Sequence, residues 1–195
     1  MSPGPEKQFD VDAALDRAVD VFQQYGYDGA SLSELMKEMG IGKKSLYDTY
    51  GNKRDLFLKA LERYSRRNLE YLRSELEKPG SAVENLRRVL RKSIMSHAGN
   101  SSCGCLIGTS IADFDVNDPE IAGILSDRVR QIEDMFYKHL VRARDAEELG
   151  ANVNPRDLAR ALVSTLQGVA LIGRVNEGRA VPQSVVNVVE SLLEN

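Results

Sequence analysis

Apolar residues recur along nearly the whole chain at the three- and four-residue spacing that places them on one face of a helix. Glycines, prolines and short polar capping residues separate these apolar stripes. No stretch shows the strict alternation that is typical of a strand, so the pattern predicts an all-α protein. The stripes lie within residues 10–25, 32–39, 43–50, 56–76, 83–95, 121–141, 158–172 and 185–193.

Residues 31–57 contain the most informative arrangement of helix starts and stops. Ser31 and Glu34 have the spacing of a capping box, which predicts a helix start. Gly40 predicts a left-handed helix end, and a shorter helix is expected over Lys43–Tyr50. Asn52 and Asp55 repeat the capping pattern and predict the start of the next helix. Helix, glycine turn and short helix form a helix-turn-helix, whose second helix enters the DNA major groove.

The side chains of the short helix and its flanks suit contact with DNA. Lysine neutralises phosphates or donates to guanine, and hydroxyl groups donate to base edges or phosphates. Capped helices also occur in any small helical bundle, but the paired lysines beside Tyr47 favour a DNA-binding head. The predicted DNA-contacting residues are Ser31, Lys43, Lys44, Ser45, Tyr47, Thr49, Tyr50 and Lys53.

This stretch resembles the DNA-binding domain of the TetR (tetracycline repressor) family of bacterial transcriptional regulators. Two departures stand out: Gly42 replaces the usual serine or threonine, and Tyr50 often has phenylalanine as its counterpart. A Gly104-Cys105-Leu106 segment, followed by Asp118-Pro119-Glu120, resembles one large branch of the family. The matching residues of the head are Ser31-Leu32, Leu35, Gly40-Ile41, Lys44-Ser45-Leu46-Tyr47, Tyr50, Lys53 and Leu56-Phe57.

The resemblance implies a head over residues 1–55 and an effector-binding and dimerisation domain over residues 56–195. It implies a homodimer on double-stranded, pseudo-palindromic operator DNA, most simply a repressor that a small molecule releases. Packing within one chain is the alternative role for the apolar faces of the C-terminal helices. The predicted dimer residues are Leu162, Leu166, Val169, Ile172, Val185, Val189 and Leu192; the predicted effector residues are Tyr71, Met95, His97, Cys105, Phe114, Phe136 and Tyr137.

The charge balance of the predicted DNA-binding stretch differs from that of the whole chain. The net charge is −3, whereas residues 31–59 carry six basic against four acidic side chains, which predicts modest, salt-sensitive DNA binding. Asp12, Asp16 and Asp20 share one face of the first helix and are expected to be simply solvated.

The cysteines suggest one alternative function, and the other reactive side chains suggest neither a metal site nor catalysis. The two cysteines, Cys103 and Cys105, permit an electrophile- or redox-sensing regulator if a cation lies close to one of them. With only His97 and His139 beside them, we expect no metal site and no cofactor. No motif of an enzyme, an export signal or a membrane helix occurs, so we expect a cytoplasmic protein that is not an enzyme.

Overall fold

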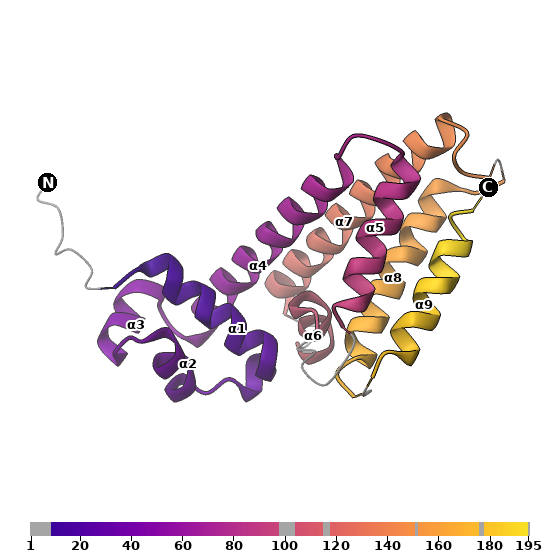
Figure 1. The fold of residues 1–195 in the computed structure, drawn as a ribbon. Helices are drawn as coiled ribbons and strands as arrows, with labels where there is room; N and C mark the ends of the chain where they lie inside the picture. The colour runs from indigo at the N-terminus through magenta and orange to yellow at the C-terminus, as the bar shows by residue number, and fades with distance from the viewer. Residues whose placement is uncertain (1–8, 98–103, 115–117, 151, 176–177, 195) are drawn as a thin grey trace, which may run out of the picture. The chain divides into compact units, whose positions relative to one another are not determined.

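The computed structural model describes residues 9–97, 104–114, 118–150, 152–175 and 178–194 (Figure 1). Within these ranges all regular secondary structure is helical, which confirms the all-α prediction. By backbone packing the chain divides into two compact units, one that extends to Arg66 and one that begins at Arg67. The division falls inside one helix, α4, so this helix contributes to both units. The functional boundary between residues 55 and 56 stays a prediction.

The first unit contains α1 (Val11–Gly29), α2 (Leu32–Met39), α3 (Lys43–Tyr50) and the N-terminal part of α4 (Lys53–Leu76). Gly26 leaves the helical conformation with φ 71°, which confirms the predicted stop, and one further turn reaches Gly29. Apolar side chains from all four helices form the core, because each helix turns one apolar stripe inward. The fully buried members are Ala18, Phe22, Leu35, Leu46, Leu56, Phe57, Ala60 and Leu61.

One ion-pair cluster within this unit corrects the sequence analysis. Asp12 and Asp20 are exposed as expected and Asp16 is half-buried, but Asp12 and Asp16 also accept hydrogen bonds from the Arg63 guanidinium of α4, which the prediction of simple solvation did not include. The Arg63 Nη1–Asp12 Oδ1 distance is 2.6 Å, and Nη2–Asp16 Oδ2 is 2.9 Å. The two carboxylates raise the pKa of Arg63 above its usual range. The spacing of the three aspartates revealed the acidic face of α1, but Arg63, the partner of Asp12 and Asp16, lies 47 to 51 residues away and could not be predicted from that spacing.

The second unit contains the C-terminal part of α4, α5 (Ala82–Met95), α6 (Leu106–Asp113), α7 (Pro119–Asp145), α8 (Pro155–Ile172) and α9 (Ala180–Ser191). In Figure 1, α5, α7, α8 and α9 lie side by side; α5 packs against the other three, and α6 packs against α7 and α8. The core contains Leu86, Leu90, Ile94, Leu106, Ile121, Phe136, Leu140 and Leu162.

The predicted helix starts of this unit are confirmed by their caps. Ser81 Oγ accepts from the backbone N–H of Glu84 at the start of α5. Asp118 accepts from two N–H groups of α7, and Asn154 does the same for α8. Because Pro119 and Pro155 have no N–H to leave unsatisfied, they fit the first helical position.

The predicted dimer face needs a correction. Leu162, Val169 and Val189 are buried within the protomer, and Leu166 and Val185 are half-buried. Only Ile172 and Leu192 of the predicted set are exposed. The physical reason is that α8 and α9 are apolar on more than one side, and the predicted stripe is the one that packs inward. The exposed apolar side chains of this region are Leu171, Ile172, Val175, Val181, Val188 and Leu192.

Candidate DNA-binding and effector sites

The α2–α3 turn has the geometry that the sequence predicted. Ser31 Oγ accepts from the backbone N–H of Glu34 at 3.1 Å and so caps α2. Gly40 ends α2 in the left-handed conformation, with φ 67° and ψ 31°. The N–H of Ile41 then bonds back to the carbonyl of Met36 at 3.1 Å, and its buried side chain anchors the turn. The bonds at both ends fix the turn that joins α2 to α3.

The outer face of α3 presents the polar residues expected to read DNA. Lys43 and Lys44 are exposed on the first turn, and Tyr47 follows them with 44% of its surface exposed. Ser45 and Thr49 are half-buried at the edges of this face. Gly42 provides no side-chain cap, so the first N–H groups of α3 have no side-chain capping bond. The positive charges of the two lysines and the free N–H groups at the N-terminus of α3 lie together and favour binding of a DNA phosphate.

Tyr50 is a correction to the predicted DNA contacts. Only 2% of its surface is exposed, and its hydroxyl donates to the backbone carbonyl of Val11 at 2.7 Å. Burial, reinforced by the nearby Asp12 carboxylate, raises the pKa of Tyr50 to about 12. The residue therefore ties α3 to the start of α1, together with the buried Leu46, and does not reach the outer face.

The start of α4 is built by two reciprocal bonds and one cation–π contact. The N–H of Asn52 donates to Asp55 Oδ2, and the N–H of Asp55 donates to Asn52 Oδ1, each at 3.0 Å. Lys53 Nζ lies 4.5 Å from the centre of the Tyr27 ring, which orients this predicted phosphate contact. Tyr27 packs edge-on against Phe57. The sequence shows an aromatic residue directly after the Gly26 stop, but its contact with Lys53 joins positions 26 residues apart and was not predicted.

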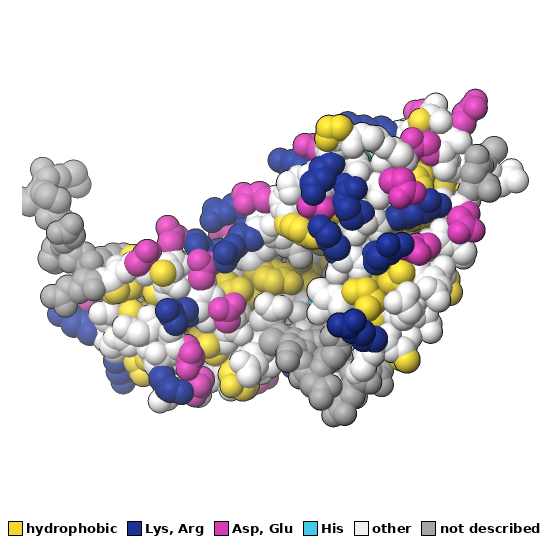
Figure 2. Space-filling view, viewed as in Figure 1, with side chains coloured by type: hydrophobic (Ala, Val, Ile, Leu, Met, Phe, Trp, Pro, Cys, Tyr) yellow, Lys and Arg dark blue, Asp and Glu magenta, His cyan; other side chains and the backbone are white. Residues whose placement is uncertain are grey.

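Lys and Arg side chains do not form one dominant patch on the face of the molecule shown in Figure 2. There, basic and acidic side chains are interspersed over the described parts of the chain.

The predicted effector residues are scattered. Tyr71 is exposed, Met95 and His97 are half-buried at the end of α5, and Phe136 is fully buried in the core. Tyr137 stacks under the guanidinium of Arg156 at 3.8 Å. Burial lowers the pKa of His97. Of the seven predicted residues, only Phe114 lines a cavity described below.

The structure describes one of the two cysteines that the sequence offered as possible electrophile or redox sensors. Cys105 is the N-cap of α6, ahead of its first turn, and it is buried. Cys103 lies outside the described residues. Among the residues that the structure describes, no cluster of His, Cys, Asp and Glu side chains is suited to a metal ion.

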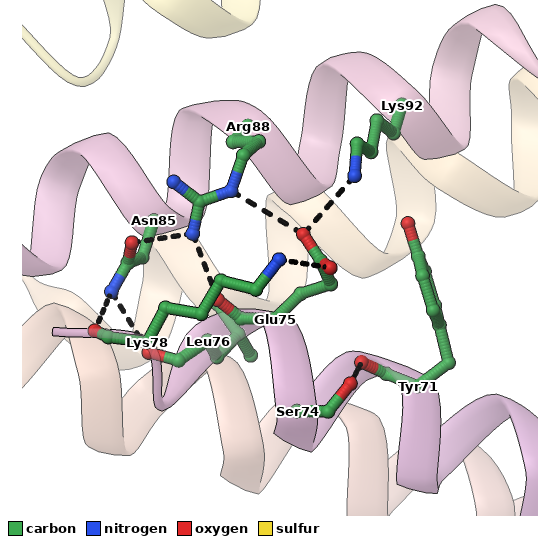
Figure 3. A network of polar contacts seen from close by, with 8 residues as sticks. All are labelled: Tyr71, Ser74, Glu75, Leu76, Lys78, Asn85, Arg88 and Lys92. Carbon is green, nitrogen blue, oxygen red and sulfur yellow. Dashed lines mark hydrogen bonds and ion pairs between the residues drawn. The ribbon is translucent and has the colours of Figure 1, made fainter.

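A polar network holds the end of α4 to α5 (Figure 3). Glu75, which is buried although charged, pairs with Lys78 at 2.5 Å, with Lys92 at 3.2 Å and with Arg88 at 3.3 Å. Hydrogen bonds and charge from Lys78, and then from Lys92, lower the pKa of Glu75 to about 2. Asn85 of α5 donates to the carbonyl groups of Leu76 and Lys78 and closes the same network.

Two cavities lie within the second unit, and of the predicted effector residues only Phe114 lines either of them. The larger, of about 660 Å³, is a groove between α4 and α7 and is lined by Leu69, Arg73, Glu77, Gln131, Asp134, Met135, Lys138, His139 and Arg142. The smaller, of about 290 Å³, lies between α6 and α7 and is mostly apolar; it is lined by Ser110, Ile111, Phe114, Ile121, Ala122, Leu125, Ser126 and Val129. The sequence signal for the first was a polar stripe on α7 at spacings of three and four residues.

The capped α2, the glycine turn and the exposed first turn of α3 define the class: a helix-turn-helix DNA-binding protein. Comparison with known families agrees with this class and identifies one family within it. Residues 14–60 match the model of bacterial regulatory proteins of the tetR family, and residues 82–189 match the tetracyclin repressor-like C-terminal domain. The chain belongs to the TetR family and is a DNA-binding transcriptional regulator.

Individual relatives with regulator or repressor names match most of the chain. An uncharacterized HTH-type transcriptional regulator of Bacillus subtilis, YezE, is 36% identical over 98% of this chain and 100% of its own. The Escherichia coli repressor ComR is 27% identical over 89% of this chain and 83% of its own. A cysteine-substituted form of the regulator CifR, solved with a 26-base-pair operator, has a TM-score of 0.81 and is 29% identical; the match covers 97% of this chain and 98% of that one.

These matches point to a regulator rather than to an enzyme. No helix in the described part of the chain has both the length and the apolar character needed to cross a membrane.

Proposed function

We propose that this protein is a homodimeric transcriptional repressor that leaves a pseudo-palindromic operator when a small molecule binds to its C-terminal domain. The observation that supports this most is the outer face of α3. Lys43, Lys44 and Tyr47 are exposed there, while Leu46 and Tyr50 anchor the opposite side. Because α3 is packed against the core on one face and exposes polar side chains on the other, it is suited to enter a major groove.

The DNA contacts follow from this face. Lys43 and Lys44 neutralise phosphates or donate to guanine, and Tyr47 presents its hydroxyl to the backbone or a base edge. Ser31, Ser45, Thr49 and Lys53 flank the helix and add phosphate contacts. CifR, the relative solved with operator DNA, supports this assignment, and the name of ComR supports repression.

The dimer uses the exposed apolar side chains of α8 and α9. Val181, Val188 and Leu192 lie on one stripe of α9 and its end, and Val188 has 59% of its surface exposed. Leu171 and Ile172 extend the apolar surface at the end of α8. Large apolar side chains that gather on a surface mark an interaction site. A second copy would bury them and would place two α3 helices on two half-sites.

Release requires that the ligand bind the non-DNA-binding conformation more tightly than the DNA-binding one. α4 is the candidate lever because it is one continuous helix from Lys53 to Leu76. We place the functional boundary at residues 55 and 56, before most of this helix. We also assign the chain to the Gly-Cys-Leu branch, on Gly104-Cys105-Leu106, and to the cytoplasm, where operator DNA is found.

Footprinting tests this proposal directly. Purified protein on its own upstream intergenic DNA is expected to protect two major-groove segments about one helical turn, roughly 10 base pairs, apart. Tyr47→Ala is expected to remove the protection, whereas Lys37→Ala is not, because Lys37 is exposed on α2 and pairs with Glu34 and Glu38. Protection of a single half-site, or equal loss in both variants, would contradict the proposal.

A further inference from the structure

The groove between α4 and α7 carries chemistry that neither the helix-turn-helix nor the core explains. One wall is formed by Leu69 and Arg73 of α4 and by Glu77, the first residue after this helix, whose N–H still bonds to the carbonyl of Arg73; spacings of four residues place the three on one face. Its α7 wall includes Lys138, His139 and Arg142. The volume of about 660 Å³ lies within the range of small-molecule sites.

His139 is the unusual residue at this site. Only 5% of its surface is exposed, and its Nδ1 lies 2.9 Å from the carbonyl oxygen of Met135. Because a carbonyl only accepts, Nδ1 carries the proton, and in the neutral ring Nε2 is the acceptor. Nε2 is buried and has no hydrogen-bond partner among the residues that the structure describes. Buried polar atoms in native proteins are rarely left without a hydrogen-bond partner, so a water or a bound molecule is needed to donate to Nε2.

The charges around the groove favour an anion. Arg73, Lys138 and Arg142 line it, and none forms an ion pair within the described ranges of the chain. Two acids line it, Glu77 and Asp134, and Asp134 is paired with Arg156 at 2.6 Å, although the same guanidinium nitrogen also contacts Glu133 at 3.0 Å. Three cations without an ion pair therefore face two carboxylates, of which one is paired, and a cleft with an excess of cations attracts anions.

We infer that the α4–α7 groove binds a small organic carboxylate that also carries a hydroxyl or N–H donor. The carboxylate contacts Arg73, Lys138 and Arg142, the donor contacts His139 Nε2, and Leu69 and Met135 pack against the carbon skeleton. The role of this ligand as the releasing effector rests on the proposed function. Binding to the groove does not.

Side-chain NMR of the two histidines tests the inference on the full-length, DNA-free protein. The chain has only His97 and His139, so a His97→Gln variant assigns the ring resonances even if His139→Gln fails to fold. Para-hydroxybenzoate is expected to shift the His139 Nε2 resonance and to leave that of His97 in place. Benzoate, which lacks the donor, and para-hydroxybenzyl alcohol, which lacks the charge, are each expected to bind about tenfold more weakly.

Variants separate the groove from general charge effects. Arg73→Ala and Arg142→Ala change exposed residues, and each is expected to weaken para-hydroxybenzoate about three- to fivefold, as loss of one solvent-exposed ion pair does. Arg130→Ala is the matched control, because Arg130 is exposed on the same helix, pairs with Asp127 and does not line the groove. Equal weakening in all three variants would overturn the assignment.

Two further results decide the outcome. The inference is wrong if para-hydroxybenzoate, para-hydroxyphenylacetate and beta-hydroxybutyrate all leave the His139 resonances unmoved at millimolar concentration. Binding without any change in operator affinity would overturn the effector role. Binding by a protein that has no specific affinity for DNA would support the site and contradict the proposed function, so the two failures are distinguishable.

Discussion

Replacing Tyr50 by phenylalanine separates a structural role from a DNA-contacting role at one position. The substitution removes only the hydroxyl, which donates to the carbonyl of Val11 at 2.7 Å. That distance is optimal for an O–H···O bond, and the ring keeps its place in the core. We therefore expect the free energy of unfolding to fall by about 1 kcal/mol, the net value of one such bond.

The same substitution is expected to leave operator affinity within about twofold, because a loss of ~1 kcal/mol still leaves nearly all molecules folded. A tyrosine that contacted DNA would behave differently. Two such contacts, one from each protomer, at about 1 kcal/mol apiece would weaken binding roughly thirtyfold. Urea unfolding measures the first quantity, and fluorescence anisotropy on operator DNA measures the second.

Tyr47→Phe is the matched control, since Tyr47 lies one turn away with its side chain exposed. It is expected to show the opposite pattern, with unchanged stability and weaker DNA binding. If Tyr50→Phe left the urea midpoint unchanged and reduced operator affinity as strongly as Tyr47→Phe does, Tyr50 would be a DNA contact and not a tie between α3 and α1.

Three further substitutions test other parts of the structure. Glu75→Gln removes a carboxyl whose pKa is lowered to about 2 from 4.5, so the stability it contributes is present above pH 4.5 and is lost as the pH falls to about 2. The difference in urea midpoint between wild type and variant should shrink over that window, and a constant difference would count against the ion pairs. Gly42→Ser should add a cap to α3 and stabilise the head by about 0.2–0.5 kcal/mol in urea unfolding, because Gly42 has ordinary φ −80° and open space around it; a loss of stability would argue against the observed turn. Val188→Asp should convert the proposed dimer to a monomer in sedimentation experiments. Asn187→Asp, which adds the same charge on an adjacent face of α9, should not; a dimer in both variants would exclude this surface.

Local rules predicted the parts of the head that depend on neighbouring residues. The bounds of α3, the left-handed Gly40 and the reciprocal bonds of Asn52 and Asp55 all involve residues at most a few positions apart. Caps and turns are decided by the chain within one helical turn, so the sequence carries their signal directly.

Features that depend on distant residues were missed or misjudged. The Arg63 pairs with Asp12 and Asp16, and the hydroxyl of Tyr50 on Val11, join positions about forty to fifty residues apart. A helical stripe shows that a residue is apolar but not which neighbour it packs against. This is why Val169 and Val189 were assigned to the dimer face, although they lie in the protomer core.

The effector region shows the same limit. Large side chains such as Phe136 and Tyr137 were chosen for their chemistry, yet one is core and the other stacks on Arg156. The groove depends on which faces of α4 and α7 meet, and this is a property of the assembled bundle. His139 was considered only as a metal ligand, because its burial and its unpaired nitrogen are visible only in three dimensions.

The most direct test of the central claim is operator binding by fluorescence anisotropy across a salt series, with wild type beside Lys44→Ala and Lys37→Ala. Wild type is expected to bind its upstream DNA tightly and with a clear salt dependence. If Lys44 contacts phosphate in both protomers, its loss should lower the salt slope by about 2, while Lys37→Ala should leave the slope unchanged. Equal curves for all three proteins, or no saturable binding at low salt, would contradict recognition of DNA by α3.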